Sequence, residues 1–393
     1  MEFSIPPMRN NRSQLRLLYL ANMRLPTERA HGIQIMNTCS ALAATGAGVM
    51  LVVPTRHNNI TEEPFEYYGL AKNFSIKRLT CPDTTRYGTI GNIFQSFMFS
   101  LLTFLFVLQE KRKYDVIYSR HESLLLLPSL VFNKPVFWES HAGKVSFIAR
   151  IVLRRMAGLV TITSGGRDFY VAQGISSERI LVAHDGVDLE KFVVRESKEE
   201  CRKKFNLPLD KKIVAYTGSI ALYEWKGVNV LLEAARLSND ADILFLFVGG
   251  NKDETGRMKK RYLSANILFI SKRPYPEVPY YLKAADVLVL PNKKGNEISE
   301  KFTSPMKLFE YMASGTPIVA SNLPSLKEIL SEEMAMFFEP NDPGDLLRAI
   351  EETFGDCRSA EERAGRAVAD VSRYSWRMRA GAIQEHILWY SGM

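Results

Sequence analysis

The stretch KFTSPMKLFEYMASGTPIVAS (residues 301–321) decides the fold class, because it holds a helix, a tight stop and a short apolar strand in succession. Thr303 or Ser304 can cap the helix, Pro305 suits its first position, and a glycine and a proline end it. The Ile-Val-Ala run that follows is typical of a buried strand. A helix that returns directly into a buried strand predicts an α/β domain.

Lys307 is unexpected in this helix. It lies in the first turn, where the helix dipole and the free backbone N–H groups favour an anion and disfavour a cation. A lysine is tolerable there if an anion occupies the same spot, because both the lysine and the helix start would then bind it.

The alternation of helix and strand extends over the chain in two series. The first series of apolar runs covers residues 15–21, 48–54, 114–120, 134–140, 158–163 and 179–185, and the second covers 212–218, 243–250, 266–271, 286–291 and 316–321. Helical patterns, such as 33–45 and 146–156, fall between several of these runs. Continuous apolar strands alternating with helices predict parallel sheets covered on both faces. We therefore expect two doubly wound, Rossmann-like domains, 1–192 and 193–373.

Two such domains create a cleft between the carboxyl edges of their sheets. Three segments are equipped to bind an anion there: a loop that ends at Gly32, the pair Lys226-Gly227, and the helix start from Ser304 to Lys307. A tight turn, a helix-start glycine and a surface lysine would explain each segment singly, but their coincidence favours a diphosphate ligand. A Gly-x-Gly-x-x-Gly fingerprint after a strand and a Walker A sequence are both missing from the chain, which argues against a dinucleotide and against ATP hydrolysis.

Composition indicates an ordinary soluble protein of about two domains, with 393 residues of which 46% are hydrophobic and 24% charged. The four cysteines stand far apart, without Cys-x-x-Cys or nearby histidine pairs, so we predict neither a zinc site nor a disulfide framework and expect a reducing compartment. The first 14 residues lack an apolar core, and we expect no signal peptide.

Positive charge is concentrated in the N-terminal half. Residues 1–192 hold 22 Lys and Arg against 15 Asp and Glu, a balance of +7, whereas residues 193–393 hold 29 against 28. Nucleic acid, anionic lipid or a phosphorylated acceptor would each explain this balance, and nucleic acid is the weakest explanation because its usual motifs are missing from the sequence.

The apolar stretch 93–108 raises the question whether this segment spans a membrane. It is 16 residues long and is interrupted by four polar residues, whereas a spanning helix needs about 20 apolar residues. We expect a buried or half-buried helix, with a helix that dips into a bilayer surface as the alternative, and no transmembrane helix.

Five motifs in fixed order resemble a known family. They are RAHGIQIMNTCSALAATG (29–46), RRMAGLVTITSGGRDFYVAQGISSERILVAHDGVDLEKF (154–192), YTGSIALYEWKGVNVLLEA (216–234), VPYYLKAADVLVLPN (278–292) and SPMKLFEYMASGTPIVAS (304–321). From about residue 15 onward the chain resembles the retaining glycosyltransferases of family 4, which have the GT-B architecture of two facing Rossmann-like domains. The last segment, 374–393, resembles the C-terminal helix of this family, which crosses back onto the first domain.

The resemblance implies roles for matching residues. Glu310 would accept hydrogen bonds from the donor's ribose hydroxyls. His141 would be catalytic, near the anomeric carbon, and a core histidine bonded to a backbone carbonyl is the alternative. The other implied donor contacts are Gly32, Ser219, Lys226, Met306 and Lys307 at the diphosphate, and Lys272, Arg273, Ser304 and Pro305 at the base or sugar.

Two positions depart from the family's pattern. Phe302 stands where the family carries the first glutamate of a Glu-x7-Glu motif, which contacts the transferred sugar, so Glu300 or Glu297 would have to substitute. Ser219 stands where many members carry an arginine, and Lys307 would have to supply the lost charge.

The resemblance implies a retaining transfer of sugar from a nucleoside-diphosphate sugar to an acceptor hydroxyl, in the synthesis of a cell-surface glycan or glycolipid. It implies no cofactor and no metal. The expected partners are the donor, a glycan or lipid-linked acceptor and an anionic membrane surface, without nucleic acid, and the expected location is the cytoplasm, at the inner face of the membrane. A nucleotide-sugar-binding regulatory protein with a degenerate cleft and a GT-B nucleotide-sugar epimerase stay open as alternatives.

Overall fold

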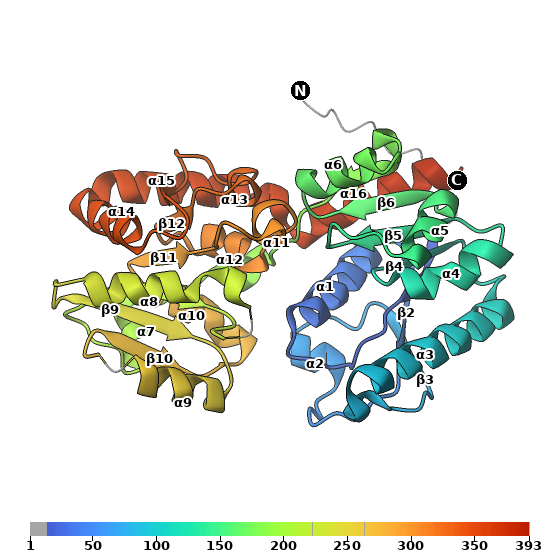
Figure 1. Cartoon of the computed structure of the whole chain (residues 1–393), viewed down its shortest axis with the longest axis horizontal. Coiled ribbons are helices and arrows are strands. Elements are labelled where there is room, and N and C mark those ends of the chain that lie inside the picture. The colour runs from blue at the N-terminus through green and yellow to red at the C-terminus, as the bar shows by residue number, and fades with distance from the viewer. Residues whose placement is uncertain (1–13, 222, 263, 393) are drawn as a thin grey trace.

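Two parallel sheets form the centres of two domains that lie side by side (Figure 1). The computed structural model describes residues 14–221, 223–262 and 264–392, so most of the stretch for which we expected no signal peptide lies outside the described residues. The first sheet has the order β3 (Ser75–Leu79), β2 (Gly48–Pro54), β1 (Arg16–Leu20), β4 (Val116–Ser119), β5 (Val136–Ser140), β6 (Gly158–Thr161) and β7 (Ile180–Val182). The second has the order β10 (Ile267–Ile270), β9 (Ile243–Val248), β8 (Lys212–Thr217), β11 (Val287–Leu290), β12 (Ile318–Ser321) and β13 (Met336–Phe338). The strand order therefore reverses in each sheet, between β1 and β4 and between β8 and β11.

Helices cover both faces of each sheet, as the continuous apolar strands require. In the N-terminal domain one face is covered by α3 (Gly88–Glu110), α4 (Glu122–Val131), α5 (Phe147–Arg155) and α6 (Ser164–Ala172), and the other by α1 (Ala30–Ala44), α2 (Pro64–Tyr68) and α16 (Trp376–Ser391). In the C-terminal domain one face is covered by α8 (Val228–Leu237), α9 (Lys252–Arg261) and α14 (Pro343–Gly355). The other is covered by α7 (Lys198–Lys204), α10 (Val278–Ala284), α12 (Met306–Ser314), α13 (Pro324–Lys327) and α15 (Cys357–Asp370), while the short α11 (Glu297–Lys301) lies next to α6 and α13.

The apolar runs did not predict two edge strands. In β3 every residue is exposed or half-buried, and its sequence SIKRL includes two cations, so it carries no continuous apolar run. β13 is only three residues long. Edge strands bury less of their surface than central ones, which removes the hydrophobic signal on which the prediction depended.

The helix expected within residues 93–108 is longer than predicted. α3 buries only one face, which includes Gln95, Phe99 and Thr103, and the apolar side chains between them stay exposed or half-buried. Two of the polar residues that seemed to interrupt the apolar run therefore lie on the inner face. Among the described residues, one helix, Thr85–Glu110, is long and apolar enough to cross a membrane, judged by length and composition alone. Of its most apolar 18-residue stretch, 28% is buried inside the protein.

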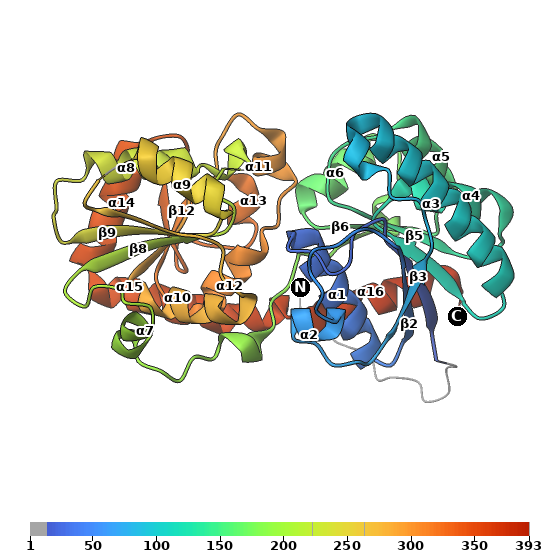
Figure 2. The same cartoon turned by 90° about the horizontal axis from the view of Figure 1, so that it is seen from below.

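The chain returns to the first domain at its C-terminal end (Figures 1 and 2). Val187 and Ser375 form a parallel bridge, and α16 then packs on α1 and β6. Trp376, Ile383 and Ile387 join the core of the N-terminal domain. The predicted crossover helix is confirmed.

Candidate active site

The carboxyl edges of the two sheets meet at the domain interface. The Thr163 hydroxyl, just after β6, donates to the Lys301 carbonyl over 2.7 Å. The Ser164 amide donates to a Glu328 carboxylate oxygen over 2.7 Å. The two sheets therefore meet at the edge where α/β domains bind ligands and where the sequence predicted the cleft.

Two glycines bring the backbone together at the strand reversal of the C-terminal sheet. Gly249, after β9, has φ +145, and a Cβ there would lie 1.9 Å from the Gly218 carbonyl oxygen. Gly227 precedes α8 with φ +69, and a Cβ there would lie 1.7 Å from the Pro291 carbonyl oxygen. A side chain at either position would force apart the loops that follow β8, β9 and β11.

The helix α12 begins at this edge without a side-chain cap. Its N-cap residue is Pro305, so the prediction that Thr303 or Ser304 caps the helix is wrong. The reason is that the Ser304 hydroxyl accepts the Asp185 amide of the other domain over 3.1 Å. Among the described residues no side chain caps the first N–H groups of α12, which suits the binding of an anion.

Lys226 and Lys307 bring two ammonium groups to the same edge. Nζ of Lys307 lies 3.4 Å from the Thr217 carbonyl oxygen and 3.7 Å from the centre of the Tyr216 ring. Nζ of Lys226 lies 4.9 Å from the centre of the Tyr223 ring. Within the described ranges, neither ammonium has a carboxylate within the 4.0 Å of an ion pair. Burial lowers the pKa of both lysines, and the charge of Lys226 lowers the pKa of Lys307 further. An anion between them would offset both penalties.

Glu310 is a buried carboxyl one turn beyond Lys307. It is 7% exposed, and the Tyr275 hydroxyl donates to its Oε1 over 2.9 Å. Burial raises the pKa of Glu310 to about 7, although the Tyr275 bond and the charge of Lys307 oppose this rise. A buried carboxylate with few donors is suited to accept hydroxyl groups from a ligand.

The predicted base region lies next to the other domain. Burial lowers the pKa of Lys272, and the charge of Glu28, from the N-terminal domain, opposes this effect. Lys272 therefore lies near Glu28 across the cleft. Arg273 forms an ion pair with Glu277 at 2.8 Å.

Three further residues were predicted to contact the diphosphate. Ser219 follows Gly218, and its carbonyl accepts the Tyr216 hydroxyl over 3.0 Å. Met306 is half-buried and packs against the core of the N-terminal domain. Packing explains the glycine at position 32, because a Cβ there would lie 2.3 Å from the Thr27 side chain. The Gly32 amide already donates to the Arg29 carbonyl.

His141 belongs to a buried polar network at the carboxyl end of β5. Its Nε2 lies 2.6 Å from Oε1 of Glu139, which is 0% exposed. The same oxygen accepts bonds from Gln34 over 2.7 Å and from Arg379 over 2.8 Å. Burial and the charge of Arg120 lower the pKa of His141, although Glu139 opposes this shift. The imidazole is thus bonded to a carboxylate, not to a backbone carbonyl, and Glu139 fixes its orientation and tautomer.

Phe302 lies in the domain interface. It is 6% exposed, and its ring meets that of Phe169 edge-on at 5.7 Å. Gly143 leaves room for it, since a Cβ there would lie 2.2 Å from the Phe302 ring. With His141 and Tyr170 it lines a tight crevice. An aromatic side chain here joins the two domains beside the predicted catalytic histidine.

Glu300 and Glu297 were the two candidates to replace the first glutamate of the Glu-x7-Glu motif, where this chain has Phe302. Both have partners close by in the sequence. Glu300 accepts the Gly295 amide over 2.6 Å. Glu297 is 74% exposed in its side chain and pairs with Lys301 at 3.4 Å.

Sequence reasoning missed Asn292 and Arg379. Asn292 directly follows Pro291 at the strand reversal, is 0% exposed, and has no hydrogen-bond partner for either amide atom among the described residues. A polar amide after an uninterrupted apolar strand was the available signal. Arg379 carried no local signal, because its partners are 195 to 341 residues away in the sequence.

One Asp-x-Asp run occurs in the sequence and needs an explanation. Asp240 and Asp242 precede β9, at the amino edge of the C-terminal sheet, and pair with Lys212 and Lys211 at 3.6 Å each. No cluster of three metal-ligating side chains occurs among the described residues. This run therefore lies away from the cleft and is charge-paired.

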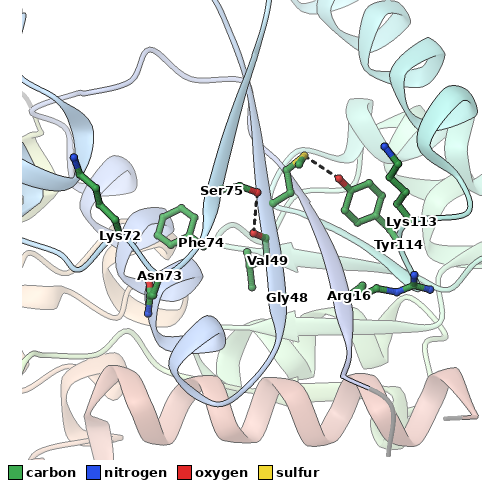
Figure 3. A pocket seen from close by; sticks show the side chains of 10 residues that line it. Arg16, Gly48, Val49, Lys72, Asn73, Phe74, Ser75, Lys113 and Tyr114 are labelled. Atoms are coloured by element: carbon green, nitrogen blue, oxygen red, sulfur yellow. Dashed lines mark hydrogen bonds between the residues drawn. The ribbon is translucent and has the colours of Figure 1, made fainter.

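A depression of about 410 Å³ lies at the opposite, amino edge of the N-terminal sheet (Figure 3). Three cations line it, and each has a carboxylate partner: Arg16 with Asp115, Lys113 with Glu110, and Lys72 with Glu63. None of the predicted donor-binding residues lines this depression. It lacks the uncompensated positive charge of the cleft.

Comparison with known proteins shows a similarity to glycosyltransferases in the C-terminal domain. The family described as glycosyl transferases group 1 matches residues 197–368. A D-inositol 3-phosphate glycosyltransferase of Corynebacterium urealyticum is 28% identical over 233 residues, which cover 55% of this chain and 53% of the relative. Sulfoquinovosyl transferase SQD2 of Arabidopsis thaliana is 23% identical over 358 residues, which cover 84% of this chain and 65% of the relative. The chain thus spans about half to two thirds of the length of these relatives.

The architecture matches as well. The structure of Anabaena HepE in complex with UDP-glucose superimposes with a TM-score of 0.72 at 16% identity, covering 97% of this chain and 100% of that one. The class of fold is therefore GT-B, as predicted. Residues 197–368 match the glycosyl transferases group 1 family, so the predicted resemblance to glycosyltransferases is confirmed for this part of the chain.

Proposed function

We propose that the protein is a retaining glycosyltransferase that moves a sugar from a nucleoside-diphosphate sugar to an acceptor hydroxyl. The observation that carries the proposal is the pair Lys226 and Lys307, two ammonium groups without a carboxylate partner in the described structure, beside the uncapped start of α12. A leaving diphosphate gains negative charge when its bond to the anomeric carbon breaks. Preorganised cations and helix N–H groups stabilise that charge.

The remaining donor contacts follow from this placement. Glu310 accepts the ribose hydroxyls, and Lys272 and Arg273 border the base. The acceptor oxygen bonds to the anomeric carbon on the face that the diphosphate leaves, and the departing phosphate oxygen takes the acceptor's proton. The configuration at the anomeric carbon is thereby kept. Because Lys226, Lys307 and the helix start neutralise the diphosphate, we propose no metal and no further cofactor.

His141 acts beside the anomeric carbon. Its lowered pKa supports a neutral imidazole, and the bond to Glu139 supports a fixed ring. A neutral, oriented ring can hydrogen-bond to a sugar hydroxyl without repelling the positive charge that develops at the anomeric carbon. Arg379, which is anchored in α16, acts through Glu139 as a positioning residue.

The acceptor side is positively charged. Burial and the charges of Arg120, Arg29 and Arg56 lower the pKa of His31 to about 4. This supports an acceptor that carries an anionic group, and we propose a lipid-linked acceptor at the cytoplasmic face of a membrane. The product would enter a cell-surface glycan or glycolipid.

A panel of nucleotide sugars, scored for binding, slow hydrolysis and transfer, tests the proposal. We expect one donor to bind and to be hydrolysed slowly without an acceptor. His141→Ala should lower kcat while leaving the donor affinity nearly intact. Glu310→Ala should weaken donor binding by about ten- to a hundredfold, because the ribose loses a charge-assisted acceptor. Tight binding without turnover would indicate a regulatory protein, and interconversion of the sugar without an acceptor would indicate an epimerase.

A further inference from the structure

The helix α3 has an inverted distribution of polarity. Its outer face carries Ile90, Ile93 and Phe97, which are 81%, 65% and 65% exposed, and this α3 face continues through Phe94, Leu101 and Leu105. Its inner face holds Gln95 and Thr103, both 0% exposed. A surface helix of a soluble domain normally shows the opposite pattern.

Specific bonds fix this orientation. The Gln95 carbonyl accepts Nη2 of Arg56 over 2.5 Å, and the Ser96 hydroxyl accepts Nδ2 of Asn22 over 3.1 Å. Asn22 and Arg56 follow β1 and β2 at the carboxyl edge of the sheet. These two bonds tie the N-terminal half of α3 to the carboxyl edge of the sheet. Phe99 and Val107 pack in the core on the same inner face, and the apolar side chains of the α3 face point outward.

The segment that contains α3, α4 and α5 is basic. Residues 85–155 hold ten Lys and Arg against four Asp and Glu, a balance of +6, out of +8 for the whole chain. Cations lie at both ends of the helix, at Arg86 and at residues 111–113. On α5, Arg150, Arg154 and Arg155 are all exposed. Figure 2 shows α3, α4 and α5 as one layer on the same side of the N-terminal sheet.

We propose that the α3 face is a docking surface for an anionic bilayer, with α3 lying in the plane of the interface and the arginines of α5 contacting lipid phosphates. Apolar side chains would enter the boundary between headgroups and acyl chains, and the basic residues would add electrostatic attraction. The helix does not span, because Phe99 and Val107 belong to the core of the domain. A second copy fits less well, since cations at both ends of α3 would face like charges in either direction of twofold pairing.

This inference rests on the proposed function and specifies the membrane partner of the acceptor site. In a parallel α/β sheet the helix after a strand starts at the carboxyl edge, so the N-terminal half of α3 lies beside the cleft. That half carries the three most exposed apolar residues of the α3 face. Docking there brings the cleft to the level of the lipid headgroups.

Cosedimentation of the full chain with vesicles tests the docking surface. We expect binding to vesicles of about three parts phosphatidylcholine to one part phosphatidylglycerol at low salt, and release at high salt or without phosphatidylglycerol. The double variant Ile93→Ser, Phe97→Ser should lower the ratio of bound to free protein by about tenfold or more. The triple variant with Arg150, Arg154 and Arg155 changed to Glu should lose the preference for phosphatidylglycerol.

Leu209→Ser, Leu237→Ser is the matched control, because these residues of the C-terminal domain are 49% and 51% exposed and should leave vesicle binding unchanged. UDP binding, measured by calorimetry, should be equal in all variants, so that loss of docking is distinguished from failure of the donor proposal. Wild-type protein that stays in the supernatant with the anionic vesicles at low salt would overturn the inference. Sedimentation velocity that shows a dimer dissolved by Phe97→Ser, without vesicle binding, would assign the face to a second copy.

Discussion

Replacing Lys307 with methionine should stabilise the empty protein and weaken its binding of nucleotide. Lys307 is half-buried, its pKa is lowered by burial and by the charge of Lys226, and it has no carboxylate within ion-pair distance in the described structure. Methionine has a similar length, and its thioether can pack on the Tyr216 ring that Nζ of Lys307 approaches at 3.7 Å. Removing a buried unpaired charge stabilises by on the order of 1–3 kcal/mol. For a domain of this size each kcal/mol raises the thermal midpoint by about 2–4 °C.

The effect on binding has the opposite sign. A diphosphate that loses one charge-assisted contact should bind roughly ten- to a hundredfold more weakly, which corresponds to about 1.5–3 kcal/mol. The gain in stability should also depend on pH. The pKa of Lys307 is lowered in the folded state, so the folded amine sheds its proton before the unfolded one. The advantage of methionine is therefore greatest near neutral pH and fades as the pH approaches the usual lysine value of 10.5.

Thermal unfolding with and without UDP, ADP or GDP, together with calorimetric titration of the nucleotide that binds best, measures both effects. Lys260→Met is the control, since this exposed lysine of α9 should change neither quantity. A Lys307→Met variant that unfolds earlier than the wild type when empty, or that binds the nucleotide as tightly, would refute the reasoning.

Three further variants test the site. Because the pKa of Glu310 is raised from 4.5 to about 7, its stabilising effect is complete below pH 4.5 and is lost as the pH rises through 7. Relative to Glu310→Gln, wild type should lose about 3 kcal/mol over this interval in chemical denaturation, and parallel pH profiles would contradict the assignment. Gly227→Ala should lower the thermal midpoint by an amount equivalent to about 2 kcal/mol or more, whereas Gly256→Ala, with no atom within 4 Å of its added Cβ, should not. Phe302→Glu introduces the glutamate that the resemblance implies at this position, but it places a charge in the domain interface, so it should lower the midpoint far more than Phe302→Leu. A neutral effect would show that the interface opens freely.

The fold was largely predictable from the sequence, because the signal is local. Central strands such as β9, whose six residues are all buried, are continuous apolar runs, and the helices between them show their own period. The runs predicted eleven of the thirteen strands in the described part of the chain and the parallel direction of the strands in both sheets. The two missed strands, β3 and β13, lie at sheet edges, where burial and therefore the apolar pattern are weakest.

The candidate site likewise has a part that local sequence predicts and a part that only the fold reveals. Lys307 and Glu310 could be predicted as donor contacts from the sequence because a cation at a helix start and a motif that resembles a family's are local features. The charge environment of Lys307 could not be predicted from the sequence, because Lys226 is 81 positions earlier and only the fold brings the two lysines together. Asn292 shows the same limit, because an asparagine after a strand is common and only burial reveals that its amide lacks partners.

Tertiary structure alone decided which faces and which partners the residues have. Ser304 was predicted as a cap, but a backbone amide of the other domain competes successfully for its hydroxyl. The apolar run of α3 predicted a buried or half-buried helix, but which face is buried depends on the bonds from Arg56 to Gln95 and from Asn22 to Ser96. Arg379 reaches Glu139 across 240 positions and thereby supports His141. Hydrophobic periodicity determines where helices and strands form, whereas hydrogen bonds between distant segments determine how each of them is oriented.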